Sequence, residues 1–187
     1  MTHRANSPEA REPELITKAQ RGDRSAFGEL VRRHRRGVIN VVYRMCGDIH
    51  FAEDMAQEAF LRAWQKLASY QPHAPFRNWV YRIATNAALD VLRKEKDFIN
   101  IDDVQLAGPG AGPEAKLARD ELGDRIKLAI LSLPPASRAV LILREYEALS
   151  YREIAETLDI PMGTVMSRLN FARNKLRQLL APDLEER

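Results

Sequence analysis

Several features that would place this chain in particular protein classes are missing from it. It has 187 residues and a single cysteine, Cys46, so no internal disulfide can form, and its four histidines do not give a zinc-site spacing. No run approaches the roughly 18 consecutive apolar positions of a membrane-spanning helix. The first residues, MTHRANSPEAREPE, lack the apolar stretch of a signal peptide. We therefore expect a cytoplasmic protein with no membrane contact of its own and with no metal or other cofactor.

Strand patterns are scarce as well. The segment 37–47, GVINVVYRMCG, is rich in β-branched residues, which favour a strand by propensity alone. No other segment offers a partner strand, so we interpret it as a buried helix. Helical periodicity is clear downstream, where apolar residues recur every three or four positions at Ala56, Ala59, Phe60, Ala63, Trp64 and Leu67. The sequence predicts an all-α fold.

The net charge of +3 is small, but it is unevenly distributed. Residues 15–96 carry 15 basic and 8 acidic side chains (+7), and residues 122–180 carry 9 and 6 (+3). Residues 97–121 carry 2 and 6 (−4) and include the Gly- and Pro-rich stretch AGPGAGP. This pattern indicates two modules that face a polyanion, joined by a flexible spacer. We predict a disordered tail at 1–14, a small helical domain at 15–96, a linker at 97–119 and a second small helical domain at 120–183.

A helix-turn-helix is predicted near the C-terminus. Ser150 followed by Glu153 forms a capping box that starts a helix, and Pro161 with Gly163 marks the turn before a longer helix over about 163–180. An apolar stripe on the longer helix should pack on its neighbour: Val165, Leu169, Ala172, Leu176 and Leu179. The opposite side carries groups that suit base edges and phosphates: Met166, Ser167, Asn170, Arg173, Asn174 and Arg177. A helical hairpin with a solvated basic face is the alternative interpretation.

Longer motifs around these segments resemble a single family. The stretch LSLPPASRAVLILREYEALSYREIAETLDIPMGTVMSRLNFARNKL resembles region 4 of the extracytoplasmic-function (ECF) sigma factors. Upstream, GDRSAFGELVRRH, AEDMAQEAFLRAW and FRNWVYRIATNAALDVLRK resemble region 2 of the same family. The resemblance covers about residues 15–180 in the family's order, with the linker where the family has one.

The resemblance implies an initiation factor rather than an enzyme. Such a protein binds core RNA polymerase at the clamp helices of the largest subunit and at the flap, recognises the −35 and −10 promoter elements, and helps to melt the −10 DNA. Promoter DNA and an anti-sigma factor are the other implied partners, and no small-molecule substrate is implied. The residues that match the family's polymerase-binding surface are Asp54, Gln57, Glu58, Phe60 and Trp64. Leu61 is added to this set because it lies on or beside the same outward stripe of the helix as Asp54, Gln57 and Glu58.

The same resemblance assigns two sets of DNA-binding residues. The −10 set is Tyr70, Arg77, Asn78, Trp79, Tyr81, Arg82, Asn86 and Arg93. The −35 set is Arg144, Ser150, Thr164, Met166, Ser167, Arg168, Asn170, Phe171 and Arg173. Basic and aromatic groups together suit unpaired DNA, which needs phosphate partners and stacking surfaces. The large aromatics are equally compatible with packing in the core, which applies to Phe60, Trp64, Trp79 and Tyr81.

Three other functions are weighed against this one. A sigma-like interaction protein that binds an anti-sigma factor without promoter recognition should lack the basic groups in both DNA sets, yet Arg77, Arg82, Arg168 and Arg173 are present. A helix-turn-helix repressor would leave residues 50–95 unexplained. An enzyme would need a nucleophile, base or metal arrangement that the sequence does not show.

Met166 generates a direct prediction about promoter preference. It stands where the family often has arginine, and a thioether cannot make the bidentate contact to guanine that arginine makes. We expect Met166→Arg to shift the preferred −35 sequence, measured as binding or initiation on a panel of −35 variants. An unchanged preference would mean that this methionine only packs.

Overall fold

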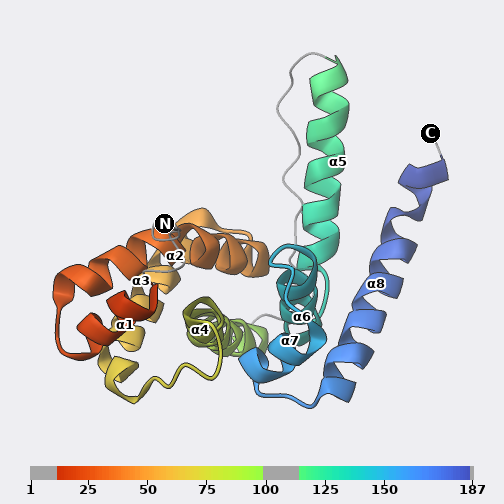
Figure 1. The fold of residues 1–187 in the computed structure, drawn as a ribbon. Coiled ribbons are helices and arrows are strands. Elements are labelled where there is room, and N and C mark those ends of the chain that lie inside the picture. The colour runs from red at the N-terminus through yellow and green to blue at the C-terminus, as the bar shows by residue number, and fades with distance from the viewer. Residues whose placement is uncertain (1–11, 99–113, 186–187) are drawn as a thin grey trace, which may run out of the picture.

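The computed structural model describes residues 12–98 and 114–185, so the predicted tail up to residue 11 and most of the predicted linker lie outside the described residues. Within these ranges the chain is helical and has no strand, which confirms the all-α prediction (Figure 1). The elements form two helical domains. They are α1 (Glu12–Gln20), α2 (Arg24–Cys46), α3 (Ile49–Lys66), the 3₁₀ turn η2 (Leu67–Ser69), α4 (Phe76–Phe98), α5 (Glu114–Leu131), α6 (Pro135–Glu145), α7 (Tyr151–Leu158) and α8 (Met162–Glu185).

The first domain is built around α2, which contains the predicted buried helix. The Asp23 side chain caps its start by accepting from the backbone N–H groups of Ser25 and Ala26 at 2.9 and 3.0 Å. Gly47 ends it with φ 82°, a left-handed conformation that favours glycine. Tertiary burial outweighs the β propensity of this segment, because its apolar side chains are packed on several sides: Val38, Val41, Val42 and Met45.

Small side chains let α3 approach its neighbours closely. Asp48 caps α3 by accepting from the backbone N–H groups of His50 and Phe51. The helix packs on α2 and α4. A row of alanines, each at most 1% exposed, faces those two helices: Ala52, Ala56, Ala59 and Ala63. The opposite side of α3 is therefore left for solvent or for a partner.

The second domain contains the predicted helix-turn-helix. Ser150 and Glu153 form the capping box at the start of α7, and Asp159 ends that helix in a left-handed conformation, φ 56° and ψ 49°. The apolar stripe of α8 is buried at Val165, Leu169 and Ala172. Leu179, predicted in the same stripe, is 40% exposed, because α8 runs on past the body of the domain (Figure 1).

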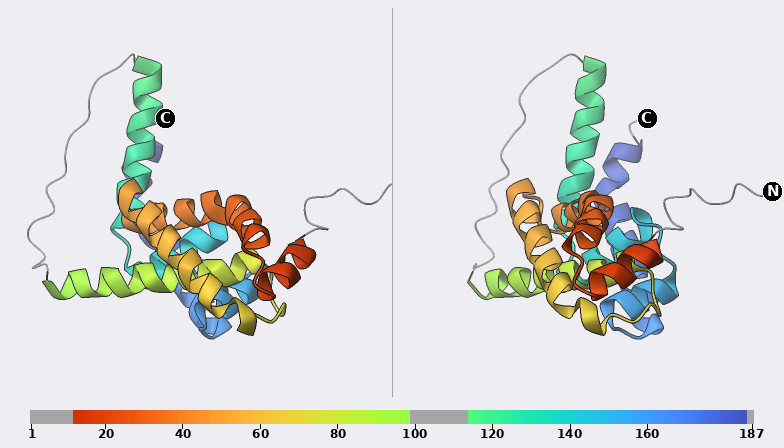
Figure 2. Two further views of the ribbon diagram at one scale, coloured as in Figure 1. Left: turned by 90° about the vertical axis from the view of Figure 1, so that its left-hand side faces the viewer. Right: turned by 60° about the vertical axis from the view of Figure 1, so that its left-hand side comes forward.

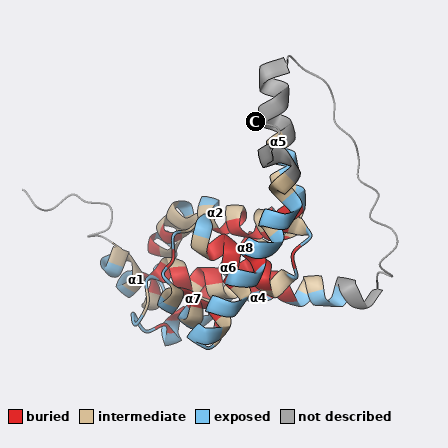
Figure 3. Cartoon of the chain, turned by 90° about the vertical axis from the view of Figure 1, so that its right-hand side faces the viewer, coloured by how far each residue is buried: buried red, intermediate tan, exposed pale blue. Residues whose placement is uncertain are grey.

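The two domains pack against each other along two seams. Helix α7 lies beside α4, and α5 and α6 lie against α2 (Figures 1 and 2). At the second seam the Arg138 guanidinium donates to the carbonyl of Met45, and Lys127 Nζ donates to Tyr43 Oη at 2.8 Å. Buried residues of both domains meet in one continuous apolar cluster (Figure 3). No helix in the described part of the chain combines the length and hydropathy needed to cross a membrane.

The capping box generates a stability prediction. Ser150→Ala removes the hydroxyl that accepts from the Glu153 backbone N–H at 3.2 Å, and loss of such a cap costs about 1 kcal/mol of unfolding free energy. Urea denaturation of the full chain at neutral pH measures this loss. An unchanged midpoint would contradict the assigned cap.

The cap also has a pH dependence with a defined sign. The Ser150 backbone N–H, and then its hydroxyl, lower the pKa of Glu153 below its ordinary 4.5. A carboxyl whose pKa is lower in the folded state stabilises the fold fully above its unfolded pKa, and that stabilisation is lost as the pH falls through the folded value. We expect Glu153→Gln, which keeps a capping amide, to have a lower free energy of unfolding than the parent at pH 7. The two free energies should converge as the pH falls through the folded pKa of Glu153, measured by urea denaturation at each pH.

Candidate functional surfaces

A groove between α2 and α3 gathers most of the first predicted set. Its volume is about 590 Å³. Five of the six predicted polymerase-binding residues line it, and the sixth, Glu58, lies outside the lining and pairs with Arg62 at 2.7 Å. From α2 the groove receives Phe27, Val31 and Arg35 among others. The predicted residues in the lining are Asp54, Gln57, Phe60, Leu61 and Trp64.

The structure separates the aromatic residues of this groove by burial. Phe60 is 6% exposed and belongs to the core. Trp64 is half-buried, with its ring 4.9 Å from that of Phe27. Leu61 is 53% exposed and is the large apolar side chain that this face offers to a partner. The apolar floor has Asp54 and Gln57 on its α3 edge, which suit basic residues of a helical partner, while Arg24 and Arg35 line its α2 edge.

The loop before α4 is held in place by hydrogen bonds and ring contacts. Gln20 Nε2 donates to the carbonyls of Leu67 and Tyr70 at 3.1 and 2.8 Å, and Tyr70 Oη donates to the carbonyl of Ala74 at 2.7 Å. The Tyr70 ring lies 4.8 Å from that of Trp79 and 5.8 Å from that of Phe76. Tyr70 is buried here, while Trp79 is half-buried. A cavity of about 870 Å³ opens between α1, this loop and the start of α4.

His34 takes part in this region, although the sequence-based prediction did not include it. Its Nε2 lies 3.0 Å from Glu12 Oε2, which ties α2 to α1, and its ring lies 5.4 Å from that of Phe76. Burial lowers the pKa of His34, and the Glu12 carboxylate partly opposes that shift. A signal was present in the sequence, because His34 is four residues from both Leu30 and Val38 on the buried side of α2. Among the described residues, no group of three or more His, Cys, Asp or Glu could hold a metal ion.

The predicted −10 residues of α4 are divided between buried and exposed positions. Asn78 and Tyr81 are each 2% exposed. Burial raises the pKa of the Tyr81 hydroxyl, and the nearby Glu147 carboxylate raises it further. Asn86 and Arg93 are exposed, whereas Arg77 and Arg82 are half-buried. The structure thus leaves the last two members of this set, Asn86 and Arg93, open and covers the others wholly or in part.

The predicted −35 residues remain more accessible. Exposed members are Ser150, Met166, Ser167, Asn170, Phe171 and Arg173, and half-buried members are Arg144, Thr164 and Arg168. Met166 and Phe171 are 53% and 49% exposed, so two apolar side chains stand among polar ones on the outer face of α8. Such side chains suit the methyl group of thymine.

Two arginines of this set already have partners. Arg173 donates from Nε and Nη2 to Glu145 Oε1 at 3.1 and 2.6 Å, and this hydrogen bonding raises the pKa of Arg173. Arg144 Nη1 donates to the carbonyl of Leu149 at 2.8 Å, and its guanidinium lies 5.2 Å from the centre of the Tyr151 ring. Arg144 therefore helps to hold the turn before α7, and Arg173 is oriented on the outer face.

Comparisons with known proteins agree with the division into two helical domains. Residues 30–98 match the family described as sigma-70 region 2, and residues 123–176 match sigma-70 region 4. The chain is 37% identical over 176 residues to the ECF RNA polymerase sigma factor SigW of Bacillus subtilis, covering 88% of this chain and 94% of that protein. It is 34% identical over 181 residues to the ECF RNA polymerase sigma-E factor of Escherichia coli, covering 90% and 93%.

Solved structures share this fold. CnrH in complex with the cytosolic domain of CnrY matches with a TM-score of 0.70 and 28% identity, covering 92% of this chain and 98% of that one. The sigma factor RpoE of Bartonella quintana, solved with the anti-sigma factor NepR, matches with a TM-score of 0.64 and 23% identity, covering 83% and 96%. At 23% identity, the likeness to RpoE shows a shared fold and nothing more.

Adjacent residues in the groove should respond differently to truncation. Phe60→Ala should lower the free energy of unfolding by about 3 kcal/mol, because it empties a core position. Leu61→Ala should change it by less than about 0.5 kcal/mol, because that side chain is exposed. Denaturant titration of the two variants checks the difference, and similar losses in both would contradict the packing described for α3.

Proposed function

The chain belongs to the ECF sigma factor family, and from that premise we propose that it binds core RNA polymerase and directs promoter-specific initiation. In this proposal it recognises the −35 and −10 elements and assists melting of the −10 DNA. It acts in the cytoplasm and has no catalytic step of its own.

The observation that carries the proposal is that one chain presents two chemically distinct open surfaces. The α2–α3 groove offers the exposed Leu61 beside acidic and amide side chains, which suits a basic helical partner such as the polymerase clamp. The outer face of α8 offers Ser167 and Asn170 to DNA, beside Arg173, which is exposed and paired with Glu145. A helix-turn-helix places this face in the major groove, while the preceding helix braces it.

The −10 element would be engaged by the loop at 70–75 and by α4. Melting needs a place for unpaired bases, and stacked aromatic rings beside basic side chains provide one. Trp79 is half-buried and is the ring of this region that can meet a base, while Tyr70 and Phe76 are buried against it, with ring centres 4.8 and 5.7 Å from that of Trp79. Arg77, between Phe76 and Trp79 in the first turn of α4, is the basic side chain beside these rings. We also assign Asn86 and Arg93 to the unpaired −10 strand, because they are the exposed members of the predicted −10 set.

An anti-sigma factor is the proposed regulatory partner. The likeness to CnrH, which was solved with the cytosolic domain of CnrY, supports this assignment. An interaction protein that only binds such a factor is the second candidate, but it would not need the polar face of α8. The polar and apolar side chains open on that face, Met166, Asn170 and Phe171 among them, favour promoter recognition.

Run-off transcription tests the proposal. Purified chain is mixed with core polymerase and a panel of promoter fragments, and promoter-specific transcripts are counted. We expect initiation on at least one fragment and a loss of more than tenfold for Leu61→Arg, because a charge would enter the apolar part of the groove. Leu128→Arg is the matched control, since Leu128 is 46% exposed on α5 and lies outside the groove.

The outcomes separate the two candidate functions. Binding of an anti-sigma protein without initiation on any fragment would favour the interaction protein. Equal activity of Leu61→Arg and Leu128→Arg would remove the groove from the proposed polymerase interface.

A further inference from the structure

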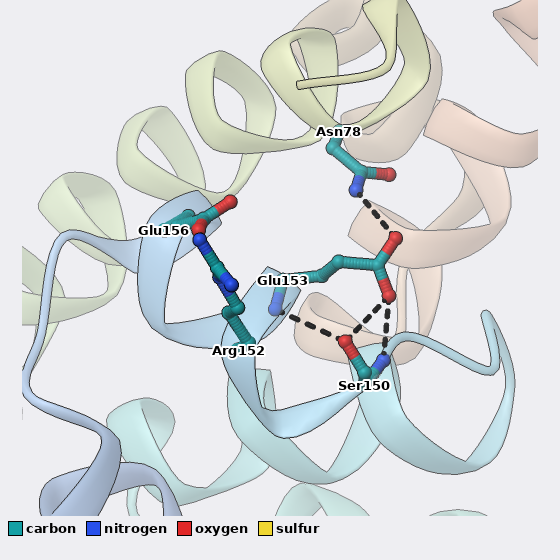
Figure 4. A network of polar contacts seen from close by, with 5 residues as sticks. All are labelled: Asn78, Ser150, Arg152, Glu153 and Glu156. Atoms are coloured by element: carbon teal, nitrogen blue, oxygen red, sulfur yellow. Dashed lines mark hydrogen bonds and ion pairs between the residues drawn. The ribbon is translucent and has the colours of Figure 1, made fainter. Parts of the chain in front are cut away.

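Three of the predicted −10 residues of α4 are already bound, and each of them contacts a carboxylate of the second domain. Helix α7 lies beside α4 (Figure 1), and Glu153 of α7 points toward Asn78 of α4 (Figure 4). The hydrogen bonds run from Asn78 Nδ2 to Glu153 Oε1 at 3.3 Å, from Tyr81 Oη to a carboxylate oxygen of Glu147, and from Arg82 Nη2 to Asp159 Oδ2 at 3.0 Å.

The three carboxylates come from α7 and from the segments at its two ends. Glu147 lies in the turn before α7, Glu153 in the first turn of the helix, and Asp159 at its C-terminal cap. We call these three residues the acidic edge. They meet donors at positions i, i+3 and i+4 of α4, which lie on one side of a helix. Because each carboxylate meets its own donor, the contact defines a single register between the two helices.

The fit of Tyr81 supports a specific contact rather than a chance approach. Its hydroxyl lies 2.6 Å from where a Cβ would stand at Gly37, in the middle of α2. Glycine weakens a helix interior, so a glycine there has a local reason. The absence of a side chain at this position gives the Tyr81 hydroxyl the space in which it meets Glu147.

From these contacts we infer that the chain masks its own −10 surface. The acidic edge binds the donors that promoter DNA would need, in the way that phosphate oxygens would, and so competes with DNA for them. Asn78 and Tyr81 are each 2% exposed in this arrangement, so neither can reach a base. The domains must separate along the α4–α7 seam before −10 DNA binds. This inference rests on the proposed function, because it takes the −10 assignment from there.

The masked arrangement is suited to release. Asn78 Oδ1 is buried without a hydrogen-bond partner, which weakens the closed state. The Arg82–Asp159 ion pair is open to water, with side chains 43% and 78% exposed, and is therefore screened by salt. The α2–α3 groove and the outer face of α8 stay accessible while the acidic edge is in place. Polymerase can thus dock on the closed chain first. The two domains then separate while polymerase is bound.

A charge-removing double variant tests the inference on the full chain. Glu147→Gln with Asp159→Asn removes two carboxylates of the acidic edge, and asparagine tolerates the left-handed conformation at 159. Glu156→Gln is the matched control. Glu156 lies on α7, between the two substituted positions, but it accepts from Arg152 at 3.0 Å and is not bonded to α4 (Figure 4). Small-angle X-ray scattering measures the radius of gyration. Fluorescence anisotropy measures affinity for a labelled single-stranded oligodeoxynucleotide of mixed sequence.

We expect the double variant to have a larger radius of gyration than the parent, and the control to match the parent. Affinity for the single strand should rise about tenfold if nine-tenths of the parent molecules are closed, because the competent fraction scales the apparent affinity. Arg82→Glu should also enlarge the chain, and adding Asp159→Arg should restore the compact radius by re-forming the pair with reversed charges. Circular dichroism melts of all variants verify that each remains folded.

The results distinguish failure of this inference from failure of the proposed function. An unchanged radius and unchanged single-strand affinity in the double variant, with run-off transcription intact, would overturn the masking and leave the sigma-factor function standing. An enlarged double variant, together with no promoter-specific initiation by any form of the chain, would retain the domain contact and overturn its role at the −10 element. Failure of the charge reversal to restore compaction would remove Arg82 and Asp159 from the contact.

Discussion

The carboxylate of Glu153 links local helix formation to the packing of the two domains. Its Oε2 accepts from the backbone N–H and the hydroxyl of Ser150 at 2.8 and 2.7 Å, which fixes where α7 begins. Its Oε1 accepts from Asn78 of α4 (Figure 4). One side chain therefore sets both the start of the bracing helix and the line along which that helix meets the other domain. The register of the whole α4–α7 seam follows from this position.

A buried cation completes the second seam. Arg138 is 7% exposed, and its guanidinium donates to the carbonyls of Leu131, Leu133 and Met45. These carbonyls lie at the C-terminal ends of α5 and α2, where backbone acceptors lack partners within the helix and where a positive charge is favoured. Burial lowers the pKa of Arg138, and an arginine nevertheless stays charged near neutrality. The pairing satisfies helix ends from both domains with one side chain.

These two seams divide the functional surfaces of the molecule. The groove between α2 and α3 lies away from both, as does the outer face of α8, and the structure leaves them open. Asn78 and Tyr81 of α4 lie inside the first seam and are covered. Under the masking inferred above, this arrangement would separate docking on polymerase from engagement of the −10 strand. The order of events then depends on how easily the acidic contacts with α4 are replaced by those with DNA.

Local patterns in the sequence were sufficient to predict several helices and one helix cap. Spacing alone predicted the capping box at Ser150, since both partners lie within one turn. The helix over 37–47 required the further observation that no partner strand exists. The outward side of α3 could also be predicted, because residues three and four apart on one helix share a side, although spacing could not tell the buried Phe60 from the exposed Leu61. The α2 wall of the groove was not predicted.

The state of the −10 surface depended on contacts between residues far apart in the chain. The sequence placed Asn78 on the polar side of its helix and left open whether Tyr81 is exposed or packed. Both are buried because α7 and the turn before it arrive from about seventy residues downstream. The burial of His34 depends in the same way on where α1 and Phe76 come to lie. The sequence by itself determined the helical fold and the cap at Ser150, and its resemblance to a family supplied the candidate residues for polymerase and DNA. Only the tertiary structure decided which of those residues are free, because burial is a property of what packs against a helix and not of the helix alone.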